Sequence, residues 1–267
     1  LLDPRRIAGS AQVIGVEELE RHEHNDIHRV LASAPGVYVR EEDGAGLRPN
    51  IGLRGVNADR SSKVTLMEDG VLFAPAPYSA AAAYYFPLVT RMVGLEVYKG
   101  PGSIRFGPQT IGGAINLRTR EVPQSLAGEL DVALGNFGQK KAHAWVGVGD
   151  ENKGLLLEGA TFGSDGFKVL DGGGSTGFLK GELMAKGRWF TEKSRGWRTG
   201  IELKASVASE DSHETYLGLT DADFQAVVVA RVVARGEHDA AVNVERVERV
   251  VDERRGDLAD VDHVDAH

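Results

Sequence analysis

Three histidines near the N-terminus, His22, His24 and His28, are the residues whose type and spacing come closest to a metal site. His24 and His28 stand four residues apart, so a helix would place both side chains on one face, where they could share a metal ion. The sequence offers no clearly placed third ligand. We therefore interpret these histidines as part of a solvated helix face, and we predict no metal site and no cofactor.

No other residues form a catalytic constellation, so the sequence predicts that the protein is not an enzyme. Gly172-Gly173-Gly174 lacks the lysine and the strand–helix context of a phosphate-binding loop and is typical of a flexible loop. The chain has no cysteine, which excludes disulfides, thiolate metal sites and cysteine nucleophiles. Its formal net charge of −8 argues against a nucleic-acid partner.

The length of 267 residues is enough for one or two domains with real cores. No apolar run reaches the roughly 18 residues of a membrane-spanning helix. The chain begins at Leu1 with no initiator methionine and no signal peptide, so we expect a mature form or a fragment.

Residues 6–123 predict an α+β domain with a small mixed sheet and short helices. Helices are expected over 16–21 and 25–34, the second with Asn25 as N-cap and an apolar stripe at helical spacing. The glycine-rich stretch from Lys99 to Arg120 indicates sharp turns and close backbone approaches around a short strand. The expected strands are 10–14, 37–39, 64–67, 71–73, 94–98 and 114–117, with a short extended element over 53–55.

Residues 126–224 change to a period of two. In 179–189, Leu, Gly, Ala and Trp occupy the odd positions, while Lys, Glu, Met and Arg occupy the even ones. This pattern over about eleven residues is typical of an outer-membrane strand with one face toward lipid. It recurs in 199–207, and we count five antiparallel strands, too few to close a barrel. A soluble β-sandwich is the alternative interpretation.

Four motifs follow one another in the first domain: Ala34-Pro35-Gly36-Val37, Leu53-Arg54-Gly55, Leu66-Met67-Glu68-Asp69-Gly70 and the stretch from Lys99 to Arg120. Together they resemble the plug domain of TonB-dependent outer-membrane receptors, in the ferric-citrate-receptor-like branch. The resemblance covers residues 6 to about 224. It implies a plug over 6–123, followed by the first strands of a truncated transmembrane β-barrel over 126–224. An unrelated soluble α+β domain would not explain the strands that follow.

The resemblance implies a receptor that takes up a ferric chelate, of the siderophore or iron-dicitrate type, with the plug gating the barrel lumen. Arg54 matches an arginine that contacts ligand in the ferric-citrate branch, whereas the other two such plug positions fall at Ala45 and Ala80. Further ligand-binding candidates in nearby loops are Arg48, Arg60 and Tyr78, since arginine forks suit carboxylate oxygens. Arg105 is expected to anchor the plug to the barrel, and an anchoring role is the alternative for Arg54.

The implied location is the outer membrane of a Gram-negative bacterium, with membrane lipid as one partner. A TonB-type energising protein in the periplasm is the other implied partner, although its recognition segment, the TonB box, is not found in residues 1–9. The alternative function is a free-standing periplasmic plug-like binding module without transport activity.

Residues 225–267 have a different composition, rich in Val, Ala, Asp, Glu and Arg. Nearly all of these residues have codons that begin with G or C, as expected when a GC-rich gene is read in a shifted frame. We therefore predict a non-native tail produced by a frameshift near Gln225. Reading the other two frames of the coding DNA tests this hypothesis, and a natural charged helix is the alternative.

Overall fold

The computed structural model describes residues 9–73, 82, 84–107, 109–169, 174–191, 199–213 and 222. The chain divides into two compact units, residues 1–215 and 216–267, and the helices and strands named below all belong to the first unit. Tyr78, Ala80 and the predicted frameshift tail lie outside the described residues.

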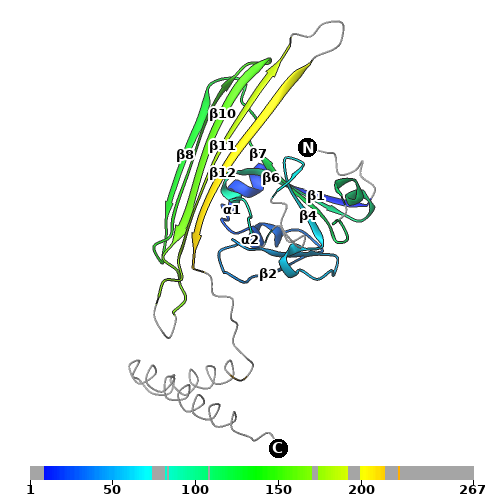
Figure 1. The fold of residues 1–267 in the computed structure, drawn as a ribbon, viewed down its shortest axis with the longest axis vertical. Helices are drawn as coiled ribbons and strands as arrows, with labels where there is room; N and C mark the ends of the chain where they lie inside the picture. Colours follow the sequence, from blue (N-terminus) through cyan, green and yellow to red (C-terminus); the bar gives the residue numbers. More distant parts are fainter. Residues whose placement is uncertain are drawn as a thin grey trace, which may run out of the picture. The chain divides into compact units, whose positions relative to one another are not determined.

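The N-terminal domain is built on a five-stranded mixed sheet (Figure 1). Only β4 and β7 are parallel, and the other neighbours in the sheet are antiparallel. Both faces of the central strands are buried, which explains their nearly continuous apolar sequences. In sheet order the strands are β1 (Ser10–Ile14), β6 (Met92–Lys99), β7 (Gly113–Thr119), β4 (Val64–Glu68) and β5 (Val71–Leu72).

A separate hairpin of β2 (Val37–Arg40) and β3 (Asn50–Leu53) lies outside this sheet, which corrects the expectation of a single sheet. The short extended element predicted over 53–55 is wrong after Leu53, which ends β3. Arg54 and Gly55 have φ angles of 55° and 84°, so the chain turns there instead of extending.

Two short α-helices precede the hairpin: α1 (Val16–His22) and α2 (Ile27–Leu31). The N-cap of α2 is Asp26 and not the predicted Asn25, because the Asp26 carboxylate accepts a hydrogen bond from the His28 backbone N–H at 2.8 Å. Short 3₁₀ helices among the described residues of this domain are η2 (Asp59–Ser61), η5 (Val89–Arg91) and η6 (Pro101–Phe106). None of the helices among the described residues is long and apolar enough to cross a membrane.

The apolar stripe predicted for the second helix enters the core of the N-terminal domain. Ile27 and Leu31 are fully buried in one cluster with the sheet residues Leu95 and Ile115 and the hairpin residue Leu53. A buried leucine or isoleucine stabilises a fold by about 1.5–3 kcal/mol, so this cluster holds the helix and the hairpin on the sheet.

Five long strands follow as an antiparallel meander in sequence order (Figure 1). Their side chains alternate in the opposite sense to a soluble sheet: in β11, Lys180, Glu182 and Lys186 are buried, whereas Leu183 and Trp189 are exposed. We call the buried side the charged face and the exposed side the apolar face. The strands are β8 (Ala127–Leu134), β9 (Lys140–Gly149), β10 (Lys153–Ser164), β11 (Phe178–Phe190) and β12 (Gly200–Ser212).

Candidate functional site

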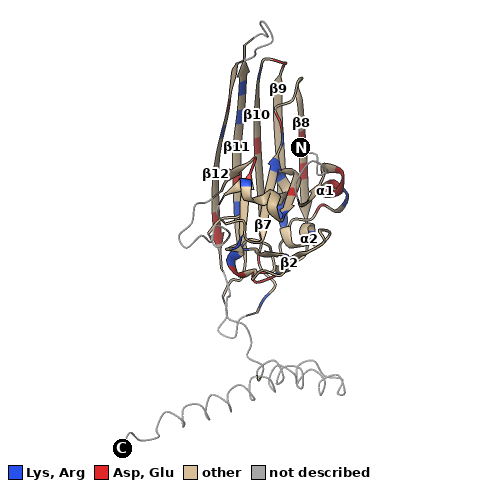
Figure 2. Cartoon of the chain, turned by 90° about the vertical axis from the view of Figure 1, so that its right-hand side faces the viewer, with Lys and Arg blue, Asp and Glu red and all other residues tan. Residues whose placement is uncertain are grey.

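The charged face of the meander meets the N-terminal domain through a buried ionic network, and Figure 2 marks the basic and acidic positions along these strands. Its centre is Arg91, at the end of η5. The Arg91 guanidinium donates two hydrogen bonds to the Glu68 carboxylate, at 2.8 and 2.7 Å, in fork geometry. Its Nε donates to Glu182 on β11. The side chains of Arg91 and Glu182 are each 2% exposed, so this contact is shielded from water.

A second group of the same network forms at the tight turn between β4 and β5. Asp69 adopts a φ of 51° there, and its carboxylate reaches the meander. The carboxylate accepts hydrogen bonds from the Thr119 backbone N–H at 2.9 Å and from Lys204 Nζ on β12 at 2.7 Å. Lys186 Nζ on β11 lies 3.4 Å away. Two adjacent acids, Glu68 and Asp69, thus bind cations on three different elements.

These contacts change the ionisation of the turn acids. Burial alone would raise the pKa of the Asp69 carboxyl, but hydrogen bonds from Lys204 and Thr119 and the charge of Lys186 outweigh it and lower the pKa to about 2. Burial also opposes ionisation of Glu68, yet Arg91 and Lys204 hold its pKa below the usual 4.5. Burial raises the pKa of the neighbouring Tyr85 hydroxyl, which stays protonated.

Acid is expected to weaken the network. A carboxylate with a depressed pKa contributes stability that is complete above its unfolded pKa, 3.8 for Asp69, and is lost as the pH falls through its folded value of about 2. The midpoint of unfolding of the full chain should therefore decrease as the pH is lowered from about 4.5 to about 2. Asparagine tolerates a positive φ, so Asp69→Asn should make this decrease, which we call the acid limb, less steep. Equal slopes of stability against pH for the original chain and the variant would contradict the assignment of the acid limb to Asp69.

Of the predicted anchors, neither Arg54 nor Arg105 meets a carboxylate among the described residues. Arg54 directly follows β3 and is exposed. Its guanidinium lies against Gly100, where an added Cβ atom would be only 2.9 Å from Arg54 Nη1. Arg105 is exposed on η6 with its guanidinium carbon 5.4 Å from the Phe106 ring centroid. Their anchoring and ligand-binding roles remain predictions.

Two other predicted ligand-binding arginines have protein partners. Arg48 forms an ion pair with Glu210 on β12 at 2.5 Å, and both side chains are at most 14% exposed. Arg60 lies 3.3 Å from Glu42 in the preceding loop. Arg48 therefore ties the loop between β2 and β3 to the meander.

A cavity of about 520 Å³ is lined in part by this loop, and the sequence did not predict it. The N-terminal domain contributes Asp26, Arg29 and the loop residues Asp43, Gly44 and Ala45. The Asp43 carboxylate shapes that loop by accepting hydrogen bonds from the backbone N–H groups of Ala45 and Gly46, at 2.6 and 2.7 Å. The meander contributes an aromatic wall of Phe137, Phe162, Phe167 and Phe178.

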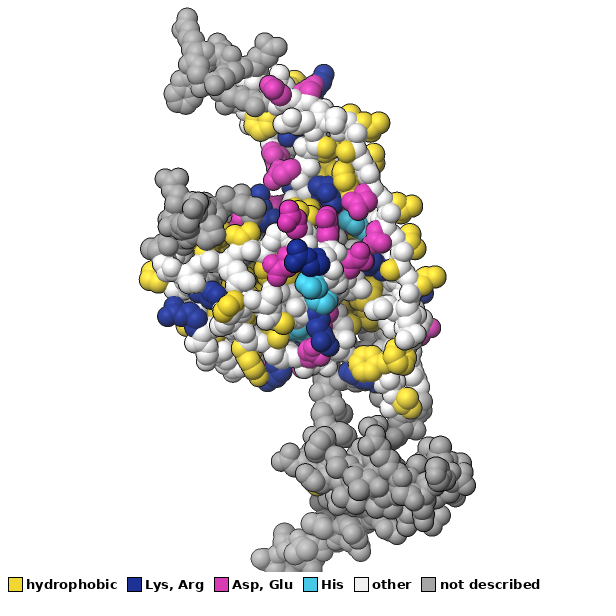
Figure 3. Space-filling view, turned by 180° about the vertical axis from the view of Figure 1, so that it is seen from behind, with side chains coloured by type: hydrophobic (Ala, Val, Ile, Leu, Met, Phe, Trp, Pro, Cys, Tyr) yellow, Lys and Arg dark blue, Asp and Glu magenta, His cyan; other side chains and the backbone are white. Residues whose placement is uncertain are grey.

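A second, more polar cavity of about 430 Å³ follows the seam between α1 and strands β8 and β9. Figure 3 shows acidic, basic and histidine side chains gathered on this side of the molecule. Lys141 pairs with Asp131 at 2.7 Å, and the buried His143 ring lies 2.8 Å from Glu158. The seam is thus lined by charged and titratable groups.

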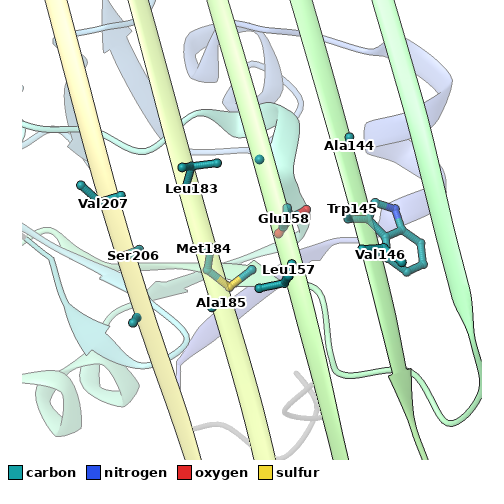
Figure 4. Close-up of a pocket in the computed structure, with 12 residues that line it drawn as sticks. Ala144, Trp145, Val146, Leu157, Glu158, Leu183, Met184, Ala185, Ser206 and Val207 are labelled. Atoms are coloured by element: carbon teal, nitrogen blue, oxygen red, sulfur yellow. The ribbon is translucent and has the colours of Figure 1, made fainter.

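The apolar face carries a shallow groove of about 620 Å³ (Figure 4). Small side chains such as Ala185 and Ala205 line it beside the larger Leu157, Leu183 and Val207. Such a surface suits hydrocarbon and offers little to fix a polar ligand.

Comparisons with known proteins agree with this arrangement. Residues 3–114 match the family model of the TonB-dependent Receptor Plug Domain. The vitamin B12 transporter BtuB of Vibrio vulnificus (strain CMCP6) is 28% identical over 166 residues, which are 62% of this chain and 27% of BtuB.

Solved structures show the same fold. The unliganded ferric citrate transporter FecA matches with a TM-score of 0.61 and 25% identity, over 82% of this chain and 33% of FecA. The siderophore receptor PirA from Acinetobacter baumannii matches with a TM-score of 0.58 and 18% identity, over 79% of this chain and 33% of PirA. The chain thus spans about a quarter to a third of the length of these relatives.

The predicted fold class is confirmed: a plug domain with a small mixed sheet and short helices, then antiparallel strands of an unclosed barrel. The matched relatives are transporters and receptors and not enzymes, and the predicted outer-membrane location is that of TonB-dependent receptors of Gram-negative bacteria. Residues 3–114 are therefore a plug domain of the TonB-dependent receptor type, continued by strands like those that begin such a receptor's barrel.

Proposed function

We propose that this chain is the plug and the first barrel strands of an outer-membrane receptor that takes up a ferric chelate, of the siderophore or iron-dicitrate type. The observation that carries this proposal is the buried network of Arg91, Glu68 and Glu182. It seats a plug against the charged face of strands whose other face is apolar. A plug held in this way gates the lumen, and uptake requires that a periplasmic TonB-type partner disturb the network.

The choice of a ferric chelate rests on two supports. The matched structures include a ferric citrate transporter and a siderophore receptor. Arg54 is exposed and without an ion pair among the described residues, and a guanidinium suits the carboxylate and other oxygens of such chelates. Arg54 is our reason for placing the chain in the ferric-citrate-like branch. Ala45 and Ala80 differ from the ligand-contacting residues that this branch has at the other two positions.

Deletion of the gene in its host tests the proposal. We expect the deletion strain to lose uptake of a radiolabelled ferric chelate, with citrate and siderophore complexes tried in turn. Cobalamin uptake serves as the control, because BtuB is also a relative. Unchanged uptake of every ferric chelate, or loss of cobalamin uptake alone, would contradict the proposed substrate. The alternative function, a free-standing periplasmic binding module, requires that the gene product be recovered in the periplasmic fraction without detergent.

Replacing Arg54 by alanine in the host gene is expected to weaken chelate binding by about 10-fold or more, since a hydrogen bond to a charged group contributes about 1.5–3 kcal/mol. Arg21→Ala is the matched control, because Arg21 is an exposed plug arginine to which no ligand-binding or anchoring role is assigned. The measurement is binding of the ferric chelate to whole cells that carry the original or the variant receptor. An Arg54→Ala receptor that binds normally but melts at a lower temperature would show that Arg54 is an anchor.

A further inference from the structure

The cluster of Asp26, His28 and Glu41 lies apart from the ionic network and has no role in the proposed uptake. One ligand atom from each of the three side chains lies within 4.8 Å of the others. Asp26 caps α2, His28 is in its first turn, and Glu41 directly follows β2. We propose that these three residues form a binding site for a divalent first-row metal ion of the zinc type.

The state of His28 is the first support. Its side chain is 1% exposed, and Nε2 has no hydrogen-bond partner in the described structure. Nδ1 faces Asp26 Oδ1 at 3.0 Å without good hydrogen-bond geometry. Buried polar atoms are almost always satisfied, so such an imidazole needs an explanation. A metal ion would satisfy one nitrogen through its lone pair, and this separation of donor atoms is what two ligands of one ion require.

The fixed position of Asp26 is the second support. Its carboxylate is held by the His28 backbone N–H at 2.8 Å. The loop after β2 closes over it, because a Cβ at Gly46 would lie 2.4 Å from Asp26 Oδ1. Asp26 and His28 therefore form a rigid pair, and the half-exposed Glu41 side chain can turn to complete the set.

The donor set indicates the class of ion. Imidazole nitrogen with two carboxylate oxygens suits zinc and similar divalent ions, and the two carboxylates balance its charge. Arg29 Nε lies 4.0 Å from Glu41, but the Arg29 side chain is 67% exposed and can move away. Three protein ligands leave one position open for water or for an oxygen of another ligand. Asp26 also lines the aromatic-walled cavity, so that position lies near it.

The sequence interpretation of these histidines was wrong in one respect. His22 and His24 are exposed, as a solvated face requires, and their ring centroids stack at 5.4 Å. His28 is buried, and it clusters with two acids instead of the predicted i, i+4 histidine. The exposed pair therefore provides a matched control for any metal that binds histidine without a built site.

Zinc binding to the purified full chain tests the site by competition with a fluorescent zinc chelator. We expect one zinc ion per chain, and Glu41→Gln should weaken binding by about 10-fold or more. The double variant His22→Gln/His24→Gln should bind as the original chain does. His28→Gln should lose the site, and if that variant misfolds, the exposed Glu41→Gln still decides.

Three results would overturn the proposal: no stoichiometric zinc on the original chain, equal affinity of Glu41→Gln, or loss of binding in the His22/His24 variant. In the last case the exposed pair is the binder. Equal affinity of Glu41→Gln would show that Glu41 is not a ligand and would leave His28 as the partner of Asp26 alone. These outcomes do not depend on chelate uptake, so this test and the test of the proposed function fail separately.

Discussion

Arg91→Met is expected to lower the free energy of unfolding of the full chain by about 3–5 kcal/mol, the usual result of removing one partner of a buried ion pair. The substitution keeps most of the apolar stem but leaves Glu182 buried with its main cation missing. Glu68 loses the two hydrogen bonds from the Arg91 guanidinium and, among the described residues, keeps its ion pair with Lys204. Denaturant unfolding in detergent, followed by tryptophan fluorescence, measures the loss.

Two further variants make this test specific. Arg40→Met removes an ion pair with Asp59 in which both side chains are more than half exposed, and such pairs contribute at most about 1 kcal/mol. Adding Glu182→Leu to Arg91→Met removes the stranded carboxylate and should recover part of the stability. An Arg91→Met chain that unfolds like Arg40→Met, or a double variant that is less stable than Arg91→Met, would show that the network does not hold the plug.

The alternation of the meander could be predicted because it is a local property. Leu179 and Leu183 are exposed while Lys180 and Glu182 are buried, and period two determines this once the strand is recognised. The strand bounds were also close, since the expected 179–189 is β11, Phe178–Phe190. The separate hairpin was missed because the sequence does not show which short apolar segment continues an existing sheet.

The partners of the buried charges could not be predicted, because they depend on long-range contacts. Glu182 meets Arg91 from 91 positions away, and Lys204 meets Asp69 from 135 positions away. An acidic turn such as Glu68-Asp69 is ordinary in sequence, since acids are common in turns. The network therefore emerges only when the two sheets are placed together. A similar reason applies to the Asp26 and His28 pair, which the distant loop of Gly46 closes over.

A gate built from buried ion pairs has a physical consequence for the proposed uptake. Such pairs add modest net stability when complete but strongly penalise any state in which one partner is missing. A plug seated in this way stays in one position until several contacts are disturbed together. Glu68 and Asp69 are adjacent on one turn, so displacement of that turn would disturb the contacts to Arg91, Lys186 and Lys204 at once.

Gly113→Ala is expected to destabilise the chain by about 3 kcal/mol or more, through both backbone strain and overpacking. Gly113 begins β7 with a φ of 153°, and a Cβ there would lie 2.3 Å from the Tyr98 carbonyl oxygen. That oxygen belongs to the neighbouring strand β6 and cannot move without breaking the pairing. Gly113 is also the first residue that pairs β7 with β4 through Val64, so both neighbours of β7 are affected.

The effect of Gly113→Ala should reach the ionic network, because β7 also carries Thr119, which holds Asp69. We therefore expect the variant to lose the acid limb attributed to Asp69 as well as stability, with trypsin resistance of the plug as a second measurement. Gly181→Ala is the control, since a Cβ at Gly181 on β11 meets nothing within 4 Å and should change stability by less than about 0.5 kcal/mol. If both variants unfold alike, close packing at the start of β7 does not support the plug. If Gly113→Ala loses stability but keeps the acid limb, the contacts of Glu68 and Asp69 do not depend on the position of β7.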